Sequence, residues 1–126
     1  MAVRFLRVVL AAGLLGAGLY GLAEVTQNRP DPSYAGQVSE LTLRVRTKEG
    51  YAHDVAAQGL WAQCRHTVRS RTLASPITQV GAGRFQLVVQ PAIGTHGTRR
   101  LLGCLEDATT PGVSGQVVDG PRRRPA

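Results

Sequence analysis

A strict alternation of apolar and polar residues marks the segment ELTLRVRTK, residues 40–48. Successive side chains of an extended strand face opposite ways, so one side of this segment is apolar and the other polar. The apolar side consists of Leu41, Leu43 and Val45. The other side carries Arg44 and Arg46, and the pattern therefore predicts a strand with one buried face and one solvated face.

Two further segments place apolar residues at the three- and four-residue spacing of a helix. In residues 49–68 the apolar stripe consists of Ala57, Leu60, Trp61, Cys64 and Val68. In residues 94–109 it consists of Leu101, Cys104, Leu105 and Ala108. We expect Asp54 to cap the first helix and Thr95 or Thr98 to cap the second, because such side chains accept an N–H of the first turn.

Between and after these helices the pattern returns to that of strands. Residues 75–92 predict a hairpin, because apolar residues lie on both sides of a glycine turn, Gly81–Gly83. After that turn the alternating apolar positions are Phe85, Leu87 and Val89. Residues 112–120 are short and β-branched enough for a final strand, and Pro111 prevents the preceding helix from continuing into it.

The resulting order, β-α-β-β-α-β, predicts an α+β fold of the ferredoxin-like split βαβ type. Right-handed crossovers would place both helices on one face of a four-stranded antiparallel sheet, with the first and third strands at its centre. One N-terminal hydrophobic helix is expected to precede this domain.

The N-terminal residues have the pattern of an export segment. A basic start is followed by an uncharged run from Val8 to Ala23, so residues 5–23 are expected to form a transmembrane anchor or a signal peptide. Arg4 and Arg7 would hold residues 1–4 in the cytoplasm, since positive charge stays inside. We therefore expect a single-pass protein of the cell membrane with its C-terminal domain outside, or a protein secreted after cleavage near Ala23.

The rest of the chain divides by composition. Residues 24–37 form a proline-containing linker, residues 38–120 the extracytoplasmic α+β domain, and residues 121–126, PRRRPA, a basic tail. We expect the tail to be disordered, because its prolines oppose strand pairing and its three arginines repel one another. The formal charge of +7 is concentrated at the two ends of the chain.

The chain has two cysteines, Cys64 and Cys104, one on each predicted helix. An even cysteine count in an exported domain favours a disulfide. His66 lies two residues from Cys64 and would point about 200° away from it on a helix, so the two cannot share a metal. No CxxC motif is present. A disulfide is therefore expected, with a metal site and a reactive thiol as weaker alternatives, and no cofactor or metal is expected.

The open face of the predicted sheet is the candidate binding face. It is expected to carry Arg44, Arg46, Arg84 and Gln86. A basic face attracts an anionic lipid or an anionic envelope polymer, and these are the expected partners. A protein partner or a homodimer is a second possibility, and a face that contacts only solvent is a third. Nucleic acid is not expected, because the open face of the central strands offers no aromatic side chain on which a base could stack.

The segments GLWAQCR and RRLLGCLEDAT resemble parts of small single-pass or secreted envelope proteins of actinobacteria. The resemblance covers roughly residues 38–120 and implies location and fold, but no activity and no catalytic residue. The sequence therefore predicts a non-enzymatic envelope protein that acts as a binding or assembly module. Two alternatives are a small enzyme or accessory subunit acting on an anionic envelope component, and a cytoplasmic-facing regulator with reduced cysteines.

Overall fold

The computed structural model describes residues 2–25 and 30–126, and the chain divides into two units at Pro30. The first unit contains helix α1 (Ala2–Val25). Its stretch Val3–Val25 is long and apolar enough to cross a membrane, and a signal sequence has the same properties. The predicted N-terminal hydrophobic helix is present and extends beyond residues 5–23 at both ends. Of the predicted linker, residues 26–29 lie outside the described residues.

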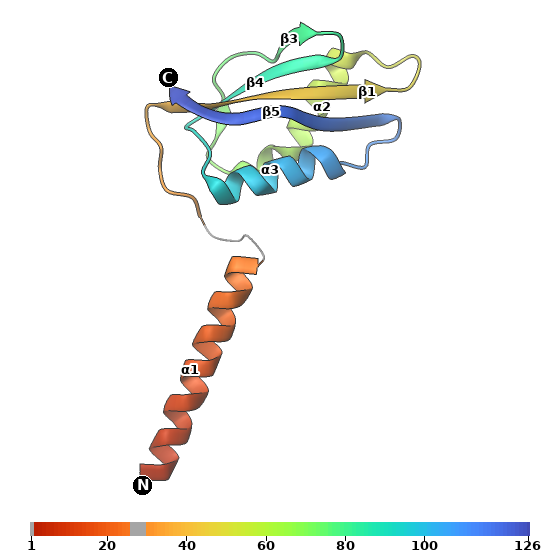
Figure 1. Cartoon of the computed structure of the whole chain (residues 1–126). Helices are drawn as coiled ribbons and strands as arrows, with labels where there is room; N and C mark the ends of the chain where they lie inside the picture. The colour runs from red at the N-terminus through yellow and green to blue at the C-terminus, as the bar shows by residue number, and fades with distance from the viewer. Residues whose placement is uncertain (1, 26–29) are drawn as a thin grey trace. The chain divides into compact units, whose positions relative to one another are not determined.

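The second unit, Asp31–Ala126, is an α+β domain built on an antiparallel sheet (Figure 1). Its elements in chain order are β1 (Gln37–Thr47), α2 (His53–Cys64), the short 3-10 helix η1 (Arg65–Val68), β2 (Thr72–Leu73), β3 (Thr78–Gly81), β4 (Arg84–Gln90), α3 (Thr95–Asp107) and β5 (Val113–Pro125). The sheet has five strands in the order β2-β4-β1-β5, and β3 also pairs with β4. β1 and β4 are therefore central, as the sequence predicted.

The prediction of four strands is wrong, because a further short strand, β2, precedes the hairpin that was expected over residues 75–92. β2 and β3 both lie along β4, with Thr72 opposite Gln90 and Thr78 opposite Gln86. Pro76 lies between the two short strands and has no backbone N–H to donate to the sheet. The pairing with β4 is consequently interrupted there and resumes at Thr78.

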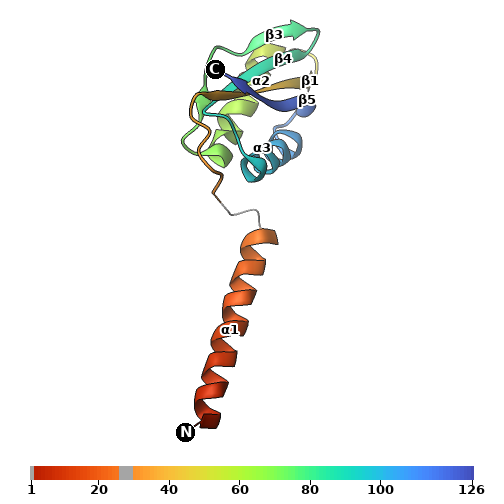
Figure 2. The ribbon, with the colours of Figure 1, turned by 60° about the vertical axis from the view of Figure 1, so that its left-hand side comes forward.

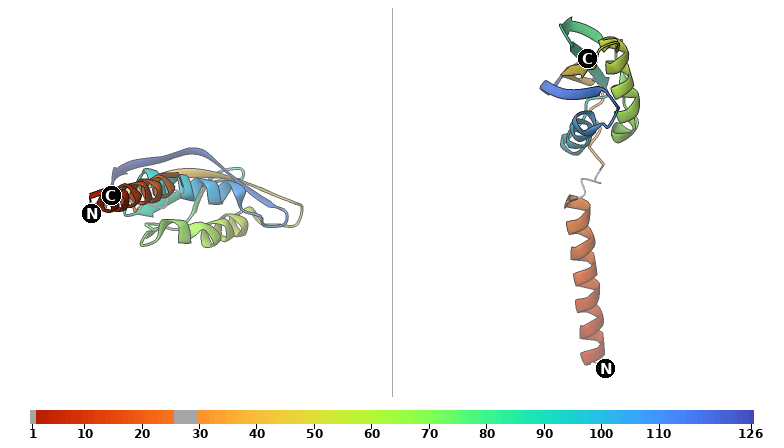
Figure 3. Two further views of the ribbon diagram at one scale, coloured as in Figure 1. Left: turned by 90° about the horizontal axis from the view of Figure 1, so that it is seen from below. Right: turned by 90° about the vertical axis from the view of Figure 1, so that its right-hand side faces the viewer.

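The core lies between the sheet and the two helices, which cover the same face of it (Figure 3). Its largest members come from both layers: Leu41, Leu43, Phe85 and Leu87 from the sheet, and Leu60, Trp61, Leu101 and Leu105 from the helices. Each buried side chain of this size contributes about 1.5–3 kcal/mol through removal from water. The alternation in β1 and β4 therefore determines which sheet face packs against the helices and which remains open.

The prediction of a disordered tail at residues 121–126 is wrong, since β5 continues to Pro125. The last residues of β5 pair with the first residues of β1, for example Arg122 with Glu40 and Pro125 with Gln37. Figure 2 shows this C-terminal end of β5 beside the beginning of β1. Pro121 is accommodated because β5 is an edge strand and its register shifts there, opposite Leu41, as expected of a bulge.

The three arginines of the tail each have a neighbour that offsets their mutual repulsion. Arg122 forms an ion pair of 2.7 Å with Asp119, and Arg124 one of 2.6 Å with Glu40. The guanidinium of Arg123 lies 4.4 Å from the ring centroid of Tyr34, a cation–π arrangement. These contacts are made by residues far away along the chain or on the other side of a bulge, which the local composition does not reveal.

The predicted helix caps are also wrong. Helix α2 begins at His53 after Ala52, with no side-chain cap, so Asp54 lies in the first turn rather than before it. Helix α3 begins directly at Thr95, after Gly94, and neither Thr95 nor Thr98 occupies the capping position. The side chain that caps α3 comes instead from a residue more than sixty positions earlier in the sequence.

Asp31 is that capping residue. One of its carboxylate oxygens, Oδ1, accepts the N–H of His96 at 3.0 Å, and Oδ2 accepts those of Gly94 at 3.1 Å and Gly97 at 2.7 Å. A carboxylate satisfies the unpaired donors of a first helical turn and interacts favourably with the helix dipole. Asp31, in the middle of the predicted linker 24–37, is therefore bound to the domain.

Candidate functional site

The two cysteines join the helices α2 and α3. Cys64 ends α2 and is fully buried, and its Sγ lies 2.04 Å from that of Cys104, with a sequence separation of 40 residues. Closing a loop of this length stabilises a fold by about 4 kcal/mol on the chain-entropy model. In a domain of this size such a bond is a large share of the total stability.

The histidines are bound locally and lie in different parts of the domain. Nε2 of His53 is 3.4 Å from Oγ1 of Thr47, and Nδ1 of His66 is 2.7 Å from the carbonyl oxygen of Gln63. The backbone of His96 belongs to the Asp31 cap. Within residues 2–25 and 30–126, no group of three or more His, Cys, Asp or Glu side chains is placed to hold a metal ion.

The predicted binding face is the sheet face opposite the helices. Arg44 and Arg46 project from β1 on that face, because the residues between and beside them, such as Val45, are buried on the other. Arg84 of β4 lies directly opposite Arg44 in the pairing of the two strands. The structure thus brings Arg44, Arg46 and Arg84 together, and we call these three residues the arginine cluster.

Gln86, the fourth predicted residue, is on the same face but belongs to a different set of contacts. Its amide donates a short hydrogen bond to Oε1 of Glu40, whose Oε2 pairs with Arg124. Glu40 therefore connects β4, β1 and β5 and neutralises positive charge at its end of the face. Gln86 contributes to this end rather than to the arginine cluster.

The arginine cluster lacks such a counter-ion. Among the described residues, no ion pair involves Arg44, Arg46 or Arg84. Like charges directly opposite one another on neighbouring strands are destabilising, so the Arg44–Arg84 pair costs the fold stability. A bound anion would remove that cost.

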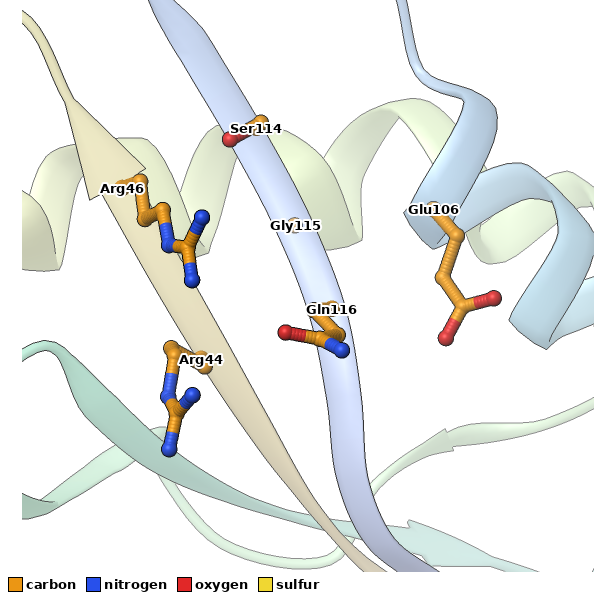
Figure 4. A pocket seen from close by; sticks show the side chains of 6 residues that line it. All are labelled: Arg44, Arg46, Glu106, Ser114, Gly115 and Gln116. Atoms are coloured by element: carbon orange, nitrogen blue, oxygen red, sulfur yellow. The ribbon is translucent and has the colours of Figure 1, made fainter.

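A shallow hollow of about 400 Å³ adjoins the cluster (Figure 4). It is lined by Arg44, Arg46, Glu106, Ser114, Gly115 and Gln116. Gln116 and Ser114 of β5 stand opposite Arg44 and Arg46 respectively. Figure 4 shows Glu106 on the other side of β5 from the two arginines. Its carboxylate accepts the backbone N–H of Val117 at 3.2 Å and so supports the edge of the sheet.

Ser114 and Gln116 were not identified from the sequence. The signal was present in the alternation of VSGQV, but assigning these side chains to the same face as Arg44 requires the register between β5 and β1. The register also separates Arg122 and Arg124 from the arginine cluster, since they pair with the opposite end of β1.

On the side of β5 that faces the arginines, the hollow offers positive charge and hydrogen-bond donors, while Glu106 lies on the other side of the strand. Guanidinium groups, a hydroxyl and an amide supply donors that bind an anion, preferably in the planar two-point manner of arginine with phosphate or carboxylate. The arginine side of the hollow contains no histidine or cysteine that could act as a base or nucleophile. Comparisons of the chain with protein-family models, with curated proteins and with solved structures found no match.

Proposed function

We propose that this chain is a non-enzymatic envelope protein whose Asp31–Ala126 domain binds an anionic component outside the cytoplasm. The observation that carries the proposal is the pairing of Arg44 with Arg84 on adjacent strands without a counter-ion among the described residues. A sheet that tolerates this repulsion gains stability when an anion occupies the site.

The location has two independent supports. Helix α1 is apolar, and Arg4 and Arg7 near its start favour a cytoplasmic N-terminus. The cysteine pair is at bonding distance, and such bonds persist mainly in oxidising compartments. We propose α1 as an uncleaved anchor, with a signal peptide cut near Ala23 as the alternative.

The strand order supports the proposal that the fold is of the ferredoxin-like type. With β2 and β3 counted as one interrupted edge strand, the sheet order β5-β1-β4-edge and the two helices on one face are those of a split βαβ domain. On this reading the open face is the surface that such domains present to ligands. The central strands offer Arg44, Gln86 and Val88 there, a set suited to an anion rather than to stacked bases.

The test is anion binding by the full chain in micelles of a zwitterionic detergent, with a fluorescent phosphate-bearing ligand and a neutral ligand of the same skeleton. The variant Arg44→Gln/Arg84→Gln should lose at least about tenfold in affinity, since each arginine near an anionic partner contributes about 1 kcal/mol. The matched control Arg65→Gln/Arg69→Gln removes the same charge from η1 and its flank, on the helical side. Equal losses in both variants, or no binding by the wild type, would contradict the proposal.

A further inference from the structure

The two ends of the open sheet face differ in charge balance. At the end where β1 begins, Glu40 and Asp119 neutralise Arg124 and Arg122. At the end where β1 finishes, the arginine cluster has no such partners among the described residues. Lys48 follows β1 directly and adds a fourth positive charge there. On the open sheet face, the positive charge without an ion pair among the described residues is therefore confined to the end where β1 finishes.

Arg44, Arg46 and Lys48 form a row along β1 and its end, and Arg84 lies beside the first of them on the neighbouring strand. Arg44 and Arg46 are two residues apart on one strand, which separates their Cα atoms by about 7 Å, and Arg84 lies one strand away from Arg44, about 5 Å. Lys48 continues the row beyond Arg46. A single small anion is best held by donors that converge on one point, whereas a row of charges matches a ligand whose negative charges repeat.

Two hollows follow the same row. The first, of about 400 Å³, adjoins Arg44 and Arg46. The second, of about 340 Å³, is lined by Arg46, Thr47, Lys48, Gly112, Val113 and Ser114. The two hollows share Arg46 and Ser114 and therefore adjoin each other. An elongated ligand could contact both, and its uncharged parts would meet the hydroxyl of Ser114.

The row also lies far from the point where the chain enters the domain. β1 starts at Gln37, beside the C-terminal end of β5, and Arg46 is near the other end of the strand. Nine residues of antiparallel strand span about 30 Å. The neutralised end of the face is thus the one where β1 begins, and the available charge is at the opposite end of β1, which we call the remote end.

We propose that the remote end of the sheet binds a linear polyanion, a polymer carrying phosphodiester or carboxylate groups at regular intervals, along the row from Arg44 through Arg46 to Lys48, with Arg84 beside Arg44 as a further contact. This inference rests on the proposed anion-binding function and narrows its ligand to a polymer. Lipid headgroups are a different ligand class and are an outcome of the test below.

The experiment compares three ligands for the full chain reconstituted in phosphatidylcholine nanodiscs: a glycerol phosphate polymer, monomeric glycerol 3-phosphate, and vesicles of phosphatidylglycerol and phosphatidylcholine. The polymer should bind at least tenfold more tightly per phosphate than the monomer. Its affinity should fall with salt concentration, as expected when counterions are released. Replacing Arg46 or Lys48 by Gln should reduce that salt dependence, by about one unit of the log–log slope per contact.

Arg65→Gln/Arg69→Gln is the matched control and should leave both the affinity and the slope unchanged. Equal affinity per phosphate for polymer and monomer would overturn the polymer inference and leave the anion site standing. Binding to the vesicles without binding to the polymer would overturn it in favour of a headgroup ligand. Failure of all three phosphate ligands to bind would overturn the proposed function as well.

Discussion

Replacing Asp31 with alanine should destabilise the domain, although Asp31 lies before the first strand and outside any helix. The change removes three hydrogen bonds to the first turn of α3, at Gly94, His96 and Gly97. Loss of a strong N-cap costs up to about 2 kcal/mol, and loss of the charge near the helix N-terminus costs up to about 1 kcal/mol more. Since Gly94 and Gly97 are buried, we expect a total of about 2–3 kcal/mol.

Thermal unfolding of the full chain in a neutral detergent measures this loss. Trp61 is the only tryptophan and is 9% exposed, so its fluorescence reports on the core of the domain and not on α1. In a domain of this size 1 kcal/mol corresponds to about 4–8 °C, so Tm should fall by about 10–20 °C. The control Asp54→Ala removes the same group from the first turn of α2, where no side-chain cap exists, and should shift Tm by only a few degrees.

A double variant makes the test specific. A Cβ added at Gly94 would lie 2.5 Å from Cγ of Asp31, and the three atoms nearest to it all belong to that side chain. Gly94→Ala should therefore destabilise the wild type but cost much less in an Asp31→Gly background, which removes all three of these atoms, a strong departure from additivity. Simple addition of the two losses, or a wild-type Tm for Asp31→Ala, would refute the cap.

Three further changes test other parts of the fold by the same fluorescence assay. Cys64→Ala/Cys104→Ala should lose about 4 kcal/mol, and a Tm that neither this change nor a reductant lowers would show that no bond forms. Deleting residues 121–126 should cost about 1–4 kcal/mol through the lost pairs with β1, whereas a free tail would leave Tm unchanged. Phe85→Ala should cost about 3–5 kcal/mol, measured by urea unfolding, and a loss below 1 kcal/mol would contradict its place in the core.

The helices and strands in which apolar residues recur at a regular spacing could be predicted from the sequence. The alternation in residues 40–48 and after the glycine turn predicted the two central strands. The apolar stripes at helical spacing, one containing Cys64 and the other Cys104, predicted two helices that face each other. These signals are strong because one face of each element is buried, and burial imposes the period.

The features that were missed depend on contacts between distant residues. GPRRRPA looks like a free tail until Glu40, Asp119 and Tyr34 are placed beside its arginines. The cap of α3 comes from Asp31, so local capping rules selected the wrong residues. Two residues of the candidate site were likewise out of reach, because Ser114 and Gln116 lie beside the arginine cluster only through the register of β5.

The central claim is that the Asp31–Ala126 domain works in an oxidising compartment, held together by the bond between its two helices. The most direct measurement is alkylation of the protein in intact cells that produce it naturally, followed by mass spectrometry of the whole chain with and without prior reduction. The account predicts that Cys64 and Cys104 are labelled only after reduction. Labelling of both thiols without a reductant would contradict it.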